Sequence, residues 1–227
     1  MAAALGWGAL AASSLVIGAL VGLSRPWPRK PVGLVLGFGA GALISAVSFE
    51  LAEEGVKIAG GLPVAIGLGA GALTYFAAAG RVASMGGGAA LALGAFLDGI
   101  PEQMVLGIGL AGGQEVSLGL LAAIFVSNLP EAVGGASDMR RQMHGSREVM
   151  RTWIAIATLC ALASVAGYAL ADVTGGDFEG GINGFAAGAL LVMLVDSMIP
   201  EATEQAGRTT GLVTTLGFAV AMGLSFA

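Results

Sequence analysis

Long apolar segments separated by short polar or glycine-rich links make up most of this sequence, and they restrict what it can fold into. Each segment is about 20 residues long, which is enough to cross the hydrocarbon core of a bilayer as an α-helix. The apolar runs are continuous rather than alternating, so they favour helices over the strands of a β-barrel. The sequence therefore predicts an all-α polytopic membrane protein with eight transmembrane helices, over residues 4–23, 32–54, 62–79, 89–110, 116–136, 152–171, 181–201 and 210–226.

Charged residues are too scarce to cover a globule in water. They make up 11% of the 227 residues, and hydrophobic residues make up 56%. A soluble domain has about 25% charged residues. We therefore expect a single transmembrane domain over residues 1–227, in a protein integral to a prokaryotic inner (plasma) membrane.

Basic residues fall almost entirely on one side of the predicted bundle. The opposite side carries only Lys57. The positive-inside rule makes the basic side cytoplasmic, so we expect both termini outside. The outer side carries Glu115, Asp172, Asp177 and Glu179, which either attract cations or are solvated loop residues. The basic side carries Arg25, Arg29, Lys30, Arg81, Arg140, Arg141, Arg147, Arg151 and Arg208.

An internal repeat relates the two ends of the chain. Residues 37–43 match residues 184–190 in the pattern GFxAGAL, and the same offset of 147 carries Glu54 onto Glu201. The matched helices are five apart, so the two copies run in opposite directions through the membrane, as in many secondary transporters. The sequence thus predicts a 3+2+3 inverted-repeat arrangement, with repeat 1 at 1–80, a central helix pair at 88–137 and repeat 2 at 150–227.

Two similar phrases lie within the central helix pair. Residues 96–102 read FLDGIPE and residues 125–131 read FVSNLPE. Pro101 and Pro130 each lack the N–H that would bond the carbonyl four residues earlier. A carboxylate at this depth costs about 2.5–3.5 kcal/mol on insertion scales, so it marks a functional site. An acid beside a freed carbonyl, repeated on adjacent helices, indicates a cation site.

Oxygen donors surround the two prolines. Asp98 and Glu102 are four residues apart and share one helix face, and Ser127 and Glu131 repeat that relation. Hard oxygen donors are the usual ligands of divalent cations. No Lys or Arg lies inside a predicted span, so a metal ion, protons or a water-filled path must relieve the acids; alternatively, protonated acids only hold the helices together. The candidate metal ligands are Asp98, Glu102, Gln103, Ser127, Asn128 and Glu131.

Further acids lie near helix ends and suggest a transport pathway. Glu50, Glu53 and Glu54 are at the outer end of the second segment. Asp196 and Glu201 are at the inner end of the seventh. An ion could pass from the first group through the central site to the second, although each acid could also be merely interfacial.

The chain resembles the ZIP (Zrt/Irt-like protein) family of divalent metal transporters. Residues 98–103 (DGIPEQ) are similar to the family's His-Asn-x-Pro-Glu-Gly phrase of helix 4, and residues 127–131 (SNLPE) to its helix 5 phrase. The GFGAGAL and GFAAGAL stretches of helices 2 and 7 are also similar to the family's. The resemblance implies eight helices in a 3+2+3 arrangement, both termini outside, and metal transport into the cytoplasm. It also implies that helices 1, 4, 5 and 6 move against helices 2, 3, 7 and 8.

The chain departs from the family pattern at the ligands. Asp98 and Ser127 replace the two histidines, Gly99 replaces the asparagine, and helix 6 carries no acid. One oxygen-rich site is therefore expected, with Zn²⁺, Mn²⁺ or Fe²⁺ as the transported substrate. The expected partners are the metal ion and the lipid bilayer, with no nucleic acid, and a homodimer is left open.

Other functions share some of these sequence features. A cation/Ca²⁺ exchanger-like antiporter also uses inverted repeats with a Pro-Glu in each. A non-transporting ZIP relative with a sensing or structural role fits the missing histidines. An intramembrane aspartyl protease is disfavoured, because Asp98 and Asp196 lack the Tyr-Asp and Gly-x-Gly-Asp settings. We therefore do not expect an enzyme.

Overall fold

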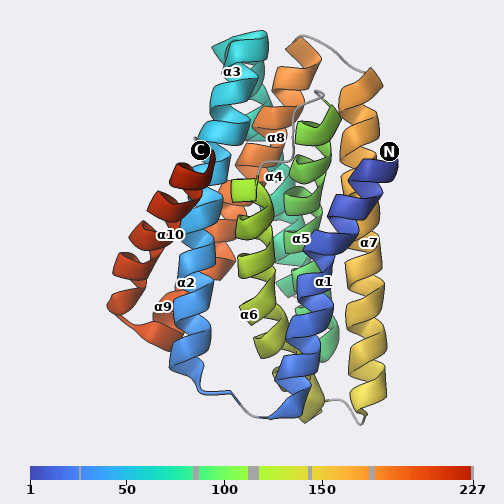
Figure 1. Ribbon diagram of the computed structural model, residues 1–227, viewed down its shortest axis with the longest axis vertical. Coiled ribbons are helices and arrows are strands. Elements are labelled where there is room, and N and C mark those ends of the chain that lie inside the picture. Colours follow the sequence, from blue (N-terminus) through green and yellow to red (C-terminus); the bar gives the residue numbers. More distant parts are fainter. Residues whose placement is uncertain (26, 84–86, 112–117, 143–144, 174–176, 226–227) are drawn as a thin grey trace.

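The described part of the chain is a bundle of eight helical rods (Figure 1). The computed structural model describes residues 1–25, 27–83, 87–111, 118–142, 145–173 and 177–225. Two rods each contain a π-helical segment, η1 or η2. The elements are α1 (Ala2–Ser24), α2 (Arg29–Ala46), η1 (Val47–Glu53), α3 (Glu54–Ala59), α4 (Gly61–Ala83), α5 (Gly87–Ala111), α6 (Leu118–Gln142), α7 (Ser146–Val173), α8 (Asp177–Met193), η2 (Leu194–Met198), α9 (Ile199–Ala206) and α10 (Thr209–Ser225).

The rods match the eight apolar segments of the sequence. Six of them, within the described residues, are long and apolar enough to cross a membrane: α1, the rod Arg29–Ala59, α4, α6, α7 and the rod Asp177–Ala206. The apolar helix α10 is shorter, at 17 residues. The prediction of an all-α protein with membrane-spanning helices is confirmed at this level.

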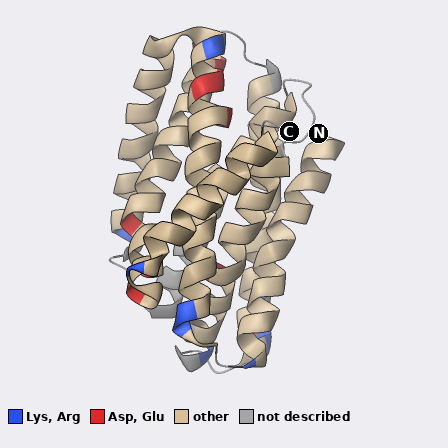
Figure 2. Ribbon diagram, turned by 60° about the vertical axis from the view of Figure 1, so that its left-hand side comes forward, with Lys and Arg blue, Asp and Glu red and all other residues tan. Residues whose placement is uncertain are grey.

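Basic residues are unevenly distributed along the long axis of the bundle. In Figure 1, α3 and the start of α8 form the upper end, and the α1–α2 connection and the start of α7 form the lower end. Figure 2 shows that Lys and Arg gather at the lower end, with one basic position near the upper end, while acidic residues lie near both ends. The described basic residue at the upper end is Lys57, as the sequence predicts.

Helix pairing follows small residues. Helix α4 packs on α8 and α10 on α2, while α5 packs on α7 and α1 on α6. A Cβ on Gly41 would overlap the carbonyl of Thr214, and one on Gly188 would overlap the carbonyl of Leu68. Glycine at these positions therefore lets the backbones touch, which is how helices associate where lipid supplies no hydrophobic driving force.

Two local backbone features recur at the offset of 147 residues. The π-helical segments begin at Val47 and Leu194. The rods that contain them end at Gly60 (φ 77°) and Gly207 (φ 64°), a conformation that glycine adopts without steric cost. Each of these glycines donates its N–H to the carbonyl four residues earlier, at 2.8 Å. The repeat seen in the sequence is thus accompanied by a repeat in backbone geometry.

Candidate metal site

The side chain of Glu102 lies at the centre of the bundle, between α5 and α6. It is 2% exposed, and Ser127 and Asn128 of α6 are each 1% exposed. Asn128 Nδ2 donates to Glu102 Oε2 at 2.7 Å, and Ser127 Oγ lies 3.1 Å from Glu102 Oε1. Three of the predicted ligands therefore meet at one point, and both carboxylate oxygens receive a hydrogen bond from a neutral group.

The amide of α6 is also fixed to its own helix, and the Ile124 carbonyl of that helix is an alternative acceptor for the single proton of the Ser127 hydroxyl. Asn128 Nδ2 donates its second proton to the carbonyl of Ile124 at 2.9 Å, and Ser127 Oγ lies 3.0 Å from the same oxygen. Both Pro101 and Pro130 lie within continuous helices. The donors that face Glu102 are thus held by a helix turn rather than by long flexible side chains.

Two buried amides near this point have atoms without a hydrogen bond in the described part of the chain. They are Asn128 Oδ1 and both amide atoms of Gln103, whose side chain is fully buried. Leaving a buried polar atom without a partner costs about 1–3 kcal/mol, so such atoms call for an explanation. Asn128 Oδ1 belongs to an amide that touches Glu102, so it is available to a cation bound there.

Close backbone contacts frame the site. A Cβ on Gly39 of α2 would lie 2.7 Å from Ser127 Cα, so α2 packs directly on the donor pair. A Cβ on Gly99 of α5 would lie 2.6 Å from Cys160 Sγ of α7. Cys160 is buried and in electrostatic range of both Glu102 and Glu131. Nothing in the sequence points to this thiol as part of the site, because only the fold brings α7 against Gly99.

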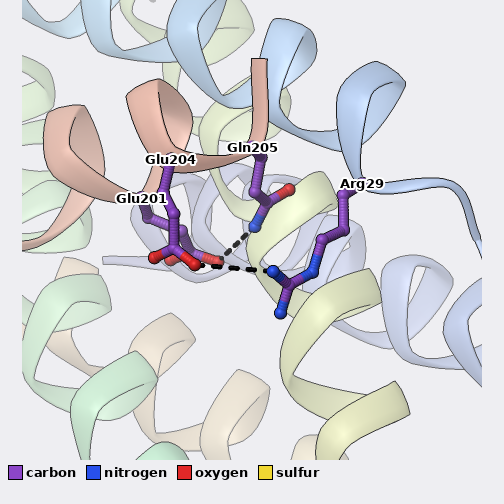
Figure 3. A network of polar contacts seen from close by, with 4 residues as sticks. All are labelled: Arg29, Glu201, Glu204 and Gln205. Atoms are coloured by element: carbon purple, nitrogen blue, oxygen red, sulfur yellow. Dashed lines mark hydrogen bonds and ion pairs between the residues drawn. The ribbon is translucent and has the colours of Figure 1, made fainter. Parts of the chain in front are cut away.

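Glu131 and Glu201 lie on the lower side of the site, and both are half-buried. A Cβ built on Gly134, about one turn below Glu131, would lie 3.8 Å from Glu201 Oε1. Glu201 accepts a hydrogen bond from Gln205 Nε2 at 2.9 Å (Figure 3). Glu201 of α9 therefore lies beside α6, below Glu131 and toward the lower end.

A surface ion pair lies beside this lower group. Arg29 and Glu204 are 3.4 Å apart, as drawn in Figure 3, and their side chains are 77% and 73% exposed. An ion pair with this exposure contributes little to stability. It brings a positive charge next to Glu201 at the lower end.

A layer of apolar side chains lies above Glu102. Val105, Leu106, Leu120 and Ile124 are each at most 4% exposed and belong to one buried cluster. Leu106 follows Glu102 by four residues, which is about 6 Å along a helix. This layer separates Glu102 from a cavity at the upper end.

The upper cavity has a volume of about 390 Å³. Val105, Leu106 and Leu120 form part of its wall, and polar residues from three rods form the rest. Ser225 Oγ donates to Glu50 Oε1 at 2.7 Å within this group. The polar wall residues are Glu50, Glu54, Glu179, Asn183 and Ser225.

The predicted pathway acids of the second segment divide into two groups. Glu50 and Glu54 line the upper cavity, but Glu53 does not, and its Oε1 pairs instead with Lys57 Nζ at 2.9 Å. A π-helix has more residues per turn than an α-helix. In η1 this rotates Glu53 away from the helix face that Glu50 and Glu54 share. The prediction from sequence spacing assumed an α-helix, and it therefore placed all three acids in one group.

The remaining predicted residues lie as follows. Asp196 is exposed on η2, and its place in the pathway stays a prediction. Asp98 lies on α5 one turn before Glu102, but its side chain lies outside the described residues, as does that of Asp172. Glu115 is outside the described residues altogether. Glu179 is in the first turn of α8 rather than in a loop.

No group of three or more His, Cys, Asp and Glu side chains is close enough to hold a metal ion among the residues that the structure describes. The potential metal ligands that meet at this point are instead the carboxylate of Glu102, the amide of Asn128 and the hydroxyl of Ser127. Comparison with protein-family models gives no match, and no curated protein matches the chain.

Proposed function

We propose that this chain is a divalent metal transporter of the kind that the ZIP resemblance implies, carrying Zn²⁺, Mn²⁺ or Fe²⁺ into the cytoplasm. The observation that carries the proposal is the buried carboxylate of Glu102, which Ser127 and Asn128 of a second helix orient. Carboxylate, amide and hydroxyl oxygens suit a divalent cation. The buried Asn128 Oδ1 offers a further acceptor beside the same carboxylate.

Polar groups on both sides of this point support a route. The upper cavity with Glu50 and Glu54 would receive the ion, and Glu131 and Glu201 would lead it to the lower end. The apolar layer at Leu106 closes the upper side in this conformation. Glu102 is 2% exposed, so an ion there would be enclosed in this conformation, and other conformations would open it to the upper and to the lower side in turn.

We propose eight spans in a 3+2+3 inverted repeat, with both termini outside. The pairing of α4 with α8 and of α10 with α2 supports this, because exchanging repeat 1 with repeat 2 turns one pair into the other. The π-helical segments and positive-φ glycines at the offset of 147 support it as well. The basic lower end would then be cytoplasmic, in a prokaryotic inner membrane. A homodimer stays a prediction.

The test is flux of Mn²⁺, Zn²⁺ and Fe²⁺, each alone, into liposomes that contain the purified protein and a metal indicator. Glu102→Gln keeps the shape of the side chain but removes the charge, and we expect at least a tenfold loss of flux. Glu148→Gln, at an exposed acid in the first turn of α7, is the matched control and should transport like the unmodified protein. Unchanged flux in Glu102→Gln would reject the proposed site.

One observation favours a second candidate. The described residues contain no group of three His, Cys, Asp or Glu side chains that could hold a metal ion. The alternative is therefore a ZIP relative with a sensing or structural role. The same assay separates the two functions, since such a protein would give no flux with any of the three metals. Dependence of flux on an opposing Na⁺ or H⁺ gradient would instead favour the exchanger-like antiporter.

A further inference from the structure

We infer that the upper cavity is a second cation site, which holds a hydrated divalent cation separately from the site at Glu102. The described residues of its wall include three carboxylates, those of Glu50, Glu54 and Glu179, and no Lys, Arg or His. Lys57 is the nearby described cation, but its side chain is 59% exposed and its amine lies closer to Glu53 than to Glu54, at 2.9 Å against 3.7 Å. The cavity therefore carries a negative field that attracts cations.

Asn183 gives a second and independent indication. This residue belongs to the cavity wall and is 3% exposed, and its Oδ1 has no hydrogen-bond donor among the described residues. A buried amide oxygen without a donor is a group that a bound ion or an ordered water satisfies. Carboxylate and amide oxygens suit a divalent cation. Among the described residues no three acids are close enough to hold one ion directly, so a cation in this cavity is held through its shell of water.

The other copy of the repeat shows that packing does not require these residues. At the offset of 147, Asn183 corresponds to Leu36, and Glu179 corresponds to Val32. Leu36 is as buried as Asn183, with 2% of its surface exposed. The same fold thus accepts apolar residues at both positions at its lower end. Glu179 and Asn183 are thus polar at the upper end alone, so binding explains these two residues better than architecture does.

The size of the cavity indicates how the cation is held. A water molecule occupies about 30 Å³ in the liquid, so a cavity of about 390 Å³ has room for an ion with its first shell of water. Such a site attracts cations by charge and discriminates little between metals. Removal of water would come afterwards, where the apolar layer at Leu106 separates the cavity from Glu102. Only this order of events depends on the proposed transport function.

The test measures Mn²⁺ binding to the full-length protein by electron paramagnetic resonance, which reports free Mn²⁺. Glu102→Gln removes the central site, and we expect this variant to retain a bound Mn²⁺ that hexaamminecobalt(III), an inert mimic of a hydrated cation, displaces. Adding Glu50→Ser, Glu179→Val and Asn183→Leu gives the upper end the residues of the lower copy and should weaken this binding at least tenfold. Glu148→Gln in the Glu102→Gln background should leave it unchanged.

The inference is overturned if Glu102→Gln protein binds no Mn²⁺, if hexaamminecobalt(III) does not compete, or if the cavity substitutions leave the affinity unchanged. Should the combined variant fail to fold, Glu179→Gln alone must weaken binding at least threefold. A failure of the proposed function is seen separately, as absent flux in the unmodified protein while this binding persists.

Discussion

Asn128→Asp tests whether Glu102 is charged when no metal is bound. The substitution replaces the amide that donates to Glu102 at 2.7 Å with a carboxylate of the same shape. Two charge centres about 4 Å apart repel by about 4 kcal/mol at an effective dielectric constant of 20. Burial and a neighbouring acid both favour the neutral carboxyl, so uptake of a proton would relieve part of this repulsion, and more of it as the pH falls.

The expected loss of stability at pH 7 is therefore about 4 kcal/mol, or roughly 8–16 °C in melting temperature for a chain of this size. Each pH unit below 7 makes protonation easier by about 1.4 kcal/mol, so most of the loss should disappear at pH 5. Saturating Mn²⁺ should also reverse it, because two carboxylates that repel each other both become ligands. Asn128→Ala, which removes the donor without adding a charge, is the control.

The assay is thermal unfolding of the purified protein in lipid nanodiscs, followed by tryptophan fluorescence at pH 7 and pH 5, with chelator or with Mn²⁺. The reasoning fails if Asn128→Asp melts like Asn128→Ala at pH 7 and shows no recovery at pH 5. That result would mean that Glu102 is already neutral, and that hydrogen bonding rather than a metal ion accounts for the buried acid.

Two further predictions concern packing and the apolar layer. Gly188→Ala places a methyl group against the carbonyl of Leu68 and should lower the melting temperature by at least 5 °C, whereas Gly69→Ala on α4, with nothing within 4 Å, should be neutral or slightly stabilising; equal effects in the two variants would contradict the close packing of α4 and α8. Leu106→Ala opens the apolar layer between the upper cavity and Glu102. We expect this variant to leak metal into the liposomes even without a gradient of any counter-ion. If Leu106→Ala does not leak, this layer is not the barrier.

Periodicity and composition were sufficient to locate the helices. The eight apolar segments coincide with the eight rods because a backbone in lipid has to satisfy its own hydrogen bonds, which leaves little freedom in secondary structure. The meeting of Glu102 with Ser127 and Asn128 also followed from the sequence, since two similar phrases on adjacent helices are expected to pair.

Features that depend on helix winding and on contacts between distant rods were not predictable. Nothing in residues 47–53 indicates a π-helix, so Glu53 was placed with Glu50 and Glu54 although it points to Lys57. Asn183 was missed, because its role depends on α8 lying beside η1 and α3 at the upper cavity. Such contacts join residues more than a hundred positions apart, and a single sequence gives no record of them.

The two Pro-Glu phrases are close copies, yet their glutamates have different surroundings. Glu102 is 2% exposed below an apolar layer, whereas Glu131 is half-buried and followed by Glu201 along the way to the lower end. Under the proposed inverted repeat, a conformation open at the upper end would exchange these surroundings. The partners of Glu131 would then be the residues that correspond to Ser127 and Asn128 at the offset of 29, which are Asp98 and Gly99. An acid facing an acid needs a cation or a proton between them, so the upper-open conformation would be stable only when loaded.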